Sequence, residues 1–155
     1  MDNSLIEEAK ANAVARFSET GAEHINCAQA VLAFALDLMY LDPALIAVAS
    51  YFGGGIARMG ETCGAITGAA MALGVRDYHL REVDAVLRAQ TSNELNQLIR
   101  SFSEEFEGVR CFDLTGCDSN TAEGQAAFQA GGNGRCPAFV EWVCDRLAPM
   151  VSSAK

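Results

Sequence analysis

The chain is poor in basic side chains and in histidine, and both shortages exclude classes of function. Eleven lysines and arginines stand against twenty acidic residues, which gives a formal net charge of −9 at pH 7. Proteins that bind nucleic acids or anionic membranes need lysine and arginine to contact phosphates. Two histidines give little material for a histidine-rich metal site. We therefore expect no nucleic-acid partner, and the acidity is most simply a feature that favours solubility.

Long apolar runs and a leader sequence are also missing. The apolar stretch from Ala28 to Leu41 is interrupted by Gln29 and Asp37 and is too short to cross a bilayer. The residues after Met1 form neither a basic segment nor an apolar one, so no secretory signal is predicted. We expect a cytoplasmic protein with no membrane insertion. In that compartment cysteines seldom form structural disulfides and more often bind metal, catalyse or lie buried.

Strand-like alternation is scarce, whereas helical periodicity runs through most of the chain. Apolar residues recur every three or four positions in the segment 5–17 and in a second segment that Asn26 caps. Half of the 155 residues are hydrophobic, which is enough for a real core. The sequence therefore predicts an all-α fold. It is a single domain over residues 1–155, built as a bundle of five or six helices.

Capping and breaking residues set the expected helix boundaries. An Asp-Pro pair at 42–43 predicts a short third helix to about residue 52. The glycines at 53–55 break the chain, and Gly74 is expected to end the helix that follows. A longer helix is expected over residues 80–106, with an interruption at 91–93. The segment 108–134 is expected to be loop-rich, before a last helix that opens at 136.

Six cysteines are the most informative feature of the chain. Thr62 is a good N-cap residue, which places Cys63 in the first turn of a helix. There, free backbone N–H groups and the helix dipole favour a thiolate. Cys27 and Cys136 lie at two other predicted helix starts. Three such helix ends can converge on one anionic centre, and Cys111 lies in a segment free to fold back onto it.

The spacing of the cysteines leaves their chemistry open. No CxxC pair is present and long stretches separate the cysteines, so no standard zinc or ferredoxin signature applies. A site made of them would be assembled by the fold. The alternative for Cys63 is a buried structural cysteine that packs like alanine. Cys144 lies mid-helix and is expected in the core, and Cys117 is either a resolving thiol or an incidental exposed one.

Small residues recur at helical spacing after Cys63, at Gly64, Ala65, Gly68 and Ala72. One face of this helix therefore carries almost no side chain. It can press its backbone against a neighbouring segment or a bound group. It also permits close helix pairing between subunits, so the sequence is compatible with a homodimer.

Five segments carry a family resemblance: NCAQAV (26–31), FGGG (52–55), GETCGAITG (60–68), CFDL (111–114) and CPAFV (136–140). Together they resemble the redox-active C-GCAxxG-C-C family, which is defined by four cysteines and a CGAxxG segment. The resemblance extends from about Ala22 to Leu147.

The resemblance implies a small, mostly helical redox protein that works with an oxidoreductase or transporter partner. A related domain of split-Soret cytochromes implies an iron–sulfur cluster as cofactor. No CxxCH motif supports covalent haem. The family's four cysteine positions correspond to Cys27, Cys63, Cys111 and Cys136. Cys117 and Cys144 are additional, and Cys117 is an alternative to Cys111.

Three functions are consistent with these residues. The first is electron transfer, with an iron–sulfur cluster on Cys27, Cys63, Cys111 and Cys136. The second is a cofactor-free thiol–disulfide reaction, in which Cys63 is a nucleophile of low pKa and Cys27 or Cys111 resolves it. The third is a structural zinc module that uses the same four thiolates. A helical bundle with buried cysteines and no chemistry is the remaining interpretation.

Overall fold

The computed structural model describes residues 2–152 and is helical throughout, with no β-strand in that range. Two short 3₁₀ helices accompany seven α-helices. The elements in chain order are α1 (Asn3–Ser18), η1 (Gly21–Glu23), α2 (Cys27–Met39), η2 (Pro43–Ala49), α3 (Gly64–Leu80), α4 (Ala85–Phe106), α5 (Cys111–Thr115), α6 (Ala122–Gln129) and α7 (Cys136–Ser152). The all-α prediction is confirmed. There are more helices than the five or six predicted, because the segment 108–134 folds into α5 and α6.

Helix α2 lies at the centre of the fold because it is apolar almost all the way round. Ten of its thirteen residues are buried, and it packs against α1, η2, α3 and α7. Its first turn is fixed by a capping box. Asn26 accepts from the Gln29 N–H at 2.9 Å, and the Gln29 side chain accepts from the Asn26 N–H at 3.0 Å. Between residues 2 and 152, none of the helices is both long and apolar enough to cross a membrane.

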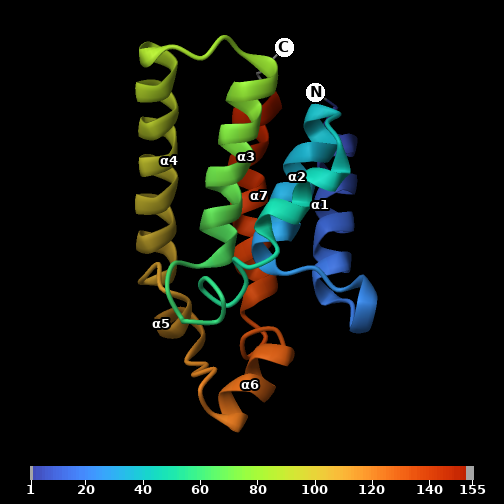
Figure 1. Cartoon of the computed structure of the whole chain (residues 1–155), viewed down its shortest axis with the longest axis vertical. Helices are drawn as coiled ribbons and strands as arrows, with labels where there is room; N and C mark the ends of the chain where they lie inside the picture. The colour runs from blue at the N-terminus through green and yellow to red at the C-terminus, as the bar shows by residue number, and fades with distance from the viewer. Residues whose placement is uncertain (1, 153–155) are drawn as a thin grey trace.

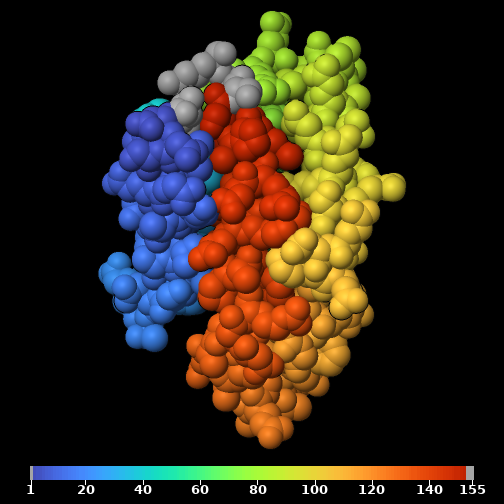
Figure 2. Space-filling model, turned by 180° about the vertical axis from the view of Figure 1, so that it is seen from behind, coloured from blue at the N-terminus to red at the C-terminus, as the bar shows by residue number. Residues whose placement is uncertain are grey.

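The long helices run in two directions (Figure 1). Helices α2, α3 and α7 all start at the end of the bundle where α5 and α6 lie, and α1 and α4 run the opposite way on the two flanks. Seen from behind, α7 lies between α1 and α4 (Figure 2). The N-terminal ends of three neighbouring helices are thereby gathered at one end of the molecule, where their dipoles favour negative charge.

Three of the predicted helix boundaries are wrong, and one predicted helix is of a different type. Gly74 does not end α3, which continues to Leu80. Residues 91–93 do not interrupt α4, because tertiary contacts outweigh their weak helix propensity. Thr91, for example, accepts a hydrogen bond from the buried Arg76 at 2.8 Å. Helix α4 also begins later than predicted, at Ala85. The short helix expected after the Asp-Pro pair at 42–43 is the 3₁₀ helix η2, which ends at Ala49.

The small-residue face of α3 packs against α2 within the chain. A Cβ atom on Gly64 would lie 2.2 Å from Cys27 Sγ, and one on Gly68 would lie 2.6 Å from the Ala28 carbonyl oxygen. Neither distance can accommodate a methyl group. This face is therefore used inside the chain and is not available for pairing between subunits.

We expect Gly64→Ala to destabilise the fold by about 1–3 kcal/mol, because its methyl group would force Cys27 away from α3. Gly74→Ala is the matched control in the same helix, since a Cβ atom there meets nothing within 4 Å. It should stabilise the fold by about 0.5–1 kcal/mol through helix propensity. Urea unfolding of the two variants and the parent measures both effects. Equal free energies of unfolding for the two variants would contradict this packing.

Candidate cysteine site

All four cysteines of the predicted site lie at helix starts, at the end of the bundle where α2, α3 and α7 begin. Cys27, Cys111 and Cys136 are the first residues of α2, α5 and α7. Cys63 is the N-cap of α3, one position earlier than expected, and its side chain makes no capping hydrogen bond. The structure thus adds Cys111 to the three helix-start cysteines that the sequence predicts.

A short backbone pairing holds Cys63 and Cys111 on neighbouring segments. Thr62 and Arg110 form an isolated antiparallel bridge. On either side of it, the Cys63 N–H donates to the carbonyl of residue 109 at 2.8 Å, and the Cys111 N–H donates to the Glu61 carbonyl at 2.7 Å. The start of α3 is therefore fixed to the start of α5, although the two are far apart in the sequence.

The sulfur of Cys27 is surrounded by backbone donors. Burial raises the pKa of Cys27, and the backbone N–H groups of Gly54, Ala28, Cys27 and Gly64 partly offset this effect. Cys27 is also partly exposed, whereas the other five cysteines are buried. Nearby backbone N–H groups suit a sulfur that carries negative charge as a ligand.

The loop that supplies the Gly54 donor is wound in the left-handed sense. Residues 54–58 all have positive φ, between 50° and 70°, and Ile56, Ala57 and Arg58 are not glycines. This conformation is unfavourable for L-residues and most of all for a β-branched one. Backbone hydrogen bonds maintain it, including one of 2.7 Å from the Ala57 N–H to the Tyr51 carbonyl. Strain of this kind clusters at functional sites, and the sequence predicted only a tight turn here.

Burial dominates the electrostatics of the thiols. It raises the pKa of Cys63 well above the ordinary range, and the neighbouring Cys27, Cys111 and Cys136 raise it further. Burial likewise raises the pKa of Cys111 and Cys136 to about 12. The expectation of a low pKa for Cys63 is therefore wrong for the metal-free chain, because desolvation outweighs the helix dipole. The mutual charge effects also indicate that these sulfurs lie near one another.

Cys117 is a fifth member of this group. Its negative charge raises the pKa of both Cys111 and Cys136, and only 2% of its surface is exposed. The alternative of an incidental exposed thiol is therefore wrong. Cys144 behaves differently. It lies in the core within α7, as expected, and the groups that shift its pKa include no other cysteine.

The gathered thiols do not form a compact site for one ion. Within residues 2–152, no three cysteine, histidine, aspartate or glutamate side chains are grouped closely enough to hold a single metal. The donors are nevertheless all sulfur, which suits iron–sulfur clusters and zinc rather than magnesium or calcium.

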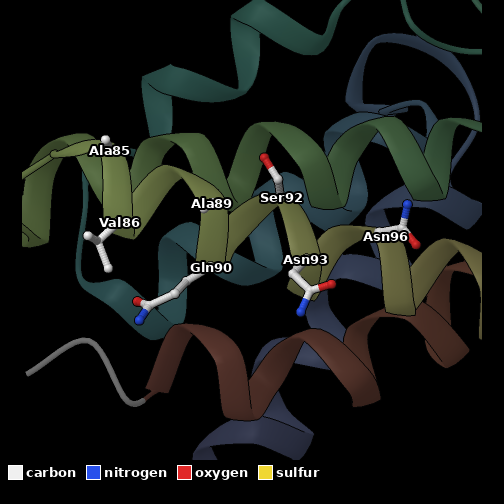
Figure 3. A pocket seen from close by; sticks show the side chains of 7 residues that line it. All are labelled: Ala85, Val86, Ala89, Gln90, Ser92, Asn93 and Asn96. Carbon is white, nitrogen blue, oxygen red and sulfur yellow. The ribbon is translucent and has the colours of Figure 1, made fainter.

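A shallow groove elsewhere carries no comparable chemistry (Figure 3). It runs along α4 and is lined by residues of that helix alone, between Ala85 and Asn96. The lining side chains are alanine, valine, serine, asparagine and glutamine, and none of them titrates. The cysteine end of the bundle is therefore the candidate site.

Alkaline pH is expected to destabilise the metal-free protein. An unfolded cysteine ionises with a pKa of about 8.5, whereas the pKa of Cys111 and Cys136 in the folded chain is raised to about 12. Between these values the unfolded chain has released protons that the folded chain retains, so the free energy of unfolding falls as the pH rises. Urea unfolding between about pH 7 and about pH 11 measures this slope. A Cys111→Ser/Cys136→Ser variant should show a shallower fall, and an identical slope would contradict the explanation.

Comparison with known proteins gives one match. A family model described as "Putative redox-active protein (C_GCAxxG_C_C)" matches residues 25–150. The matched range contains all six cysteines and the glycine-rich turn at 53–55. No curated protein and no solved structure matched the chain.

Proposed function

The chain belongs to the C_GCAxxG_C_C family, and from this premise we propose that it is an electron-transfer protein with an iron–sulfur cluster. The proposed ligands are Cys27, Cys63, Cys111 and Cys136. One observation carries the proposal: the fold brings these four cysteines, far apart in sequence, to helix starts at one end of the bundle. A cluster bound there would supply a one-electron redox centre.

The surroundings of the sulfurs support a bound anionic group. Four backbone N–H groups at Cys27 and the N-terminal ends of α2, α3 and α7 offset negative charge on the thiolates. Hydrogen bonds to cluster sulfurs raise the reduction potential, and burial keeps water away. The protein's own contribution is therefore to hold four thiolates, donate to at least one of them and exclude solvent.

Two alternatives receive less support. A structural zinc ion needs thiolates that converge on one point at about 2.3 Å, and the described residues contain no such convergence. A cofactor-free thiol–disulfide protein needs an accessible thiolate at neutral pH. Cys63 is buried and ionises with difficulty. Burial raises the pKa of Cys27 too, but its partial exposure and nearby backbone N–H groups make it a better candidate nucleophile than Cys63.

We propose an oxidoreductase or transporter component as the redox partner, met in the cytoplasm, and the surface over the site supports only that a partner docks there. Met59 and Tyr51 are 68% and 83% exposed, and Phe112, next to Gly60, is 43% exposed. Exposed apolar side chains of this size commonly mark contact surfaces. Tyr51 and Met59 lie on the loop that contains Gly54, and Phe112 lies in α5 directly after Cys111.

The deciding measurement is anaerobic purification followed by an absorbance spectrum and analysis for iron, zinc and sulfide. Visible bands with iron and sulfide in stoichiometric amounts would establish the cluster. A colourless protein that contains zinc would replace the proposal with the structural module. A colourless, metal-free protein that also takes up no iron and sulfide on reconstitution would favour thiol chemistry.

A further inference from the structure

Three cysteines surround Thr115, and only two of them belong to the proposed ligand set. Thr115 Oγ1 donates to the Cys111 carbonyl oxygen at 2.7 Å and accepts from the Cys117 N–H at 3.1 Å. A Cβ atom on Gly132 would lie 2.2 Å from Cys136 Sγ and 2.9 Å from Thr115 Cγ2. The Cys136 sulfur and the Thr115 methyl group therefore border the same small space. Cys117 lies beside this pair of ligands without being one.

The loop before α7 contacts Cys117 directly. Asn133 Nδ2 donates to Cys117 Sγ at 3.6 Å and to the Thr115 carbonyl at 2.7 Å. Residues 131–134 all have positive φ, and three of the four are glycines. Glycine backbone changes conformation at little steric cost.

Cys136 directly follows this glycine-rich turn, and its N–H donates to the Gly131 carbonyl at 3.0 Å. Its sulfur borders Gly132, next to the Asn133 side chain that contacts the Cys117 sulfur. Cys111 is tied to a different segment, because its N–H bonds to Glu61 beside the Thr62–Arg110 bridge and its carbonyl bonds to Thr115.

We propose that Cys117 is the resolving thiol of Cys136, and that the two form a disulfide when the metal-free protein meets a small disulfide such as oxidised glutathione. The proposal rests on the proposed function, because it assigns Cys136 as a ligand when the cluster is present. It extends that function with a thiol-controlled switch of the same site.

The reaction proceeds by two exchanges. Cys136, which is 7% exposed against 2% for Cys117, attacks oxidised glutathione in its thiolate form. Because burial raises the pKa of Cys136 to about 12, this exchange is slow at neutral pH and faster at alkaline pH, where the glutathione treatment is carried out. The glutathione S–S bond breaks, one reduced glutathione leaves and a mixed disulfide remains on Cys136. Cys117 then attacks the Cys136 sulfur and releases the second glutathione. The two protein thiols lose two protons and two electrons, and the two glutathione thiols gain them.

The consequence is reversible loss of one ligand. The disulfide removes Cys136 from the set of four, so the oxidised chain cannot assemble the proposed site. A dithiol reductant restores both thiols and with them the capacity to bind the cluster.

Peptide mapping of the metal-free full chain tests the disulfide. Cys144→Ser serves as the parent, because Cys144 shares a tryptic peptide with Cys136. The protein is treated with oxidised glutathione, alkylated under denaturing conditions and digested with trypsin. Cleavage after Arg110, Arg135 and Arg146 leaves Cys111 and Cys117 on one peptide, 111–135, and Cys136 on the next, 136–146.

The expected main product is peptide 111–135 linked to peptide 136–146. The link should disappear in a Cys117→Ser variant and persist in a Cys111→Ser variant. A disulfide internal to 111–135, a link that survives Cys117→Ser, or no disulfide at all would overturn the proposal.

Iron uptake separates this proposal from the proposed function. Chains pretreated with oxidised glutathione should lose most of their iron uptake on reconstitution, whereas Cys117→Ser should keep it. If untreated chains take up no iron, the cluster assignment fails and the peptide map still decides the disulfide. If the map shows the link but iron uptake is unaffected, the switch is overturned.

Discussion

Cys63→Ser is expected to leave the protein folded but unable to bind the proposed cluster. Cys63 is the N-cap of α3 and its side chain makes no capping hydrogen bond. Serine is among the best N-cap residues, so α3 should form at least as well in the variant. A serine hydroxyl does not replace a thiolate as a soft ligand. Iron and sulfide per chain after anaerobic reconstitution, together with visible absorbance, should fall from stoichiometric to near zero.

Cys144→Ser provides the matched control. Cys144 is buried in α7, away from the other five cysteines, so its replacement should leave cluster content unchanged. Urea unfolding of both variants would show that each is folded. Equal cluster content in the two variants would rule out Cys63 as a ligand.

Arg76→Ala is expected to lower the free energy of unfolding by about 3–5 kcal/mol. The Arg76 side chain is fully buried and joins three helices at the opposite end of the bundle from the cysteines. Its guanidinium donates to Asp77 at 2.7 Å, to Glu94 at 2.9 Å, to Thr91 at 2.8 Å and to the Met150 carbonyl at 3.2 Å. Removing it leaves the largely buried Asp77 carboxylate without its counter-charge.

Arg88→Ala tests whether the loss is specific. Arg88 lies in α4, the helix that carries two of the Arg76 partners, but its side chain is exposed. Replacing an exposed side chain of this kind usually alters the free energy of unfolding by less than about 0.5 kcal/mol. Denaturant unfolding of the two variants gives the comparison. A similar small effect in both would mean that the Arg76 network contributes little to the fold.

Local chemistry explains which parts of the fold the sequence predicts well. The start of α2 depends on Asn26 and Gln29, which are three residues apart and form the capping box on their own. Helix α7 begins at Cys136 because the following proline suits the first turn of a helix. Gly74 misleads because its backbone adopts helical geometry in an otherwise continuous α3, with open space beside it. Tertiary packing decided that position, and single-residue propensity does not report it.

In the candidate site, too, some features were predictable from local sequence and others were not. Helix-start positions for Cys27, Cys63 and Cys136 follow from nearby caps and breakers. The place of Cys117 among the sulfurs depends on Asn133, whose contacts with Cys117 and Thr115 arise only when α5 and the loop before α7 meet. The left-handed turn at 54–58 includes three residues that are not glycine, and no sequence rule would place them there. These features depend on long-range packing and were not predictable from the sequence.

The scattered origin of the sulfurs also constrains when the site can be completed. Cys27 opens α2 and Cys136 opens α7, with most of the bundle between them. A growing chain on the ribosome therefore presents Cys27 and Cys63 long before Cys136 exists. Delivery of the proposed cofactor would have to await synthesis of the whole segment 27–136, and machinery that loads it would act on a bundle of several helices rather than on a short nascent segment.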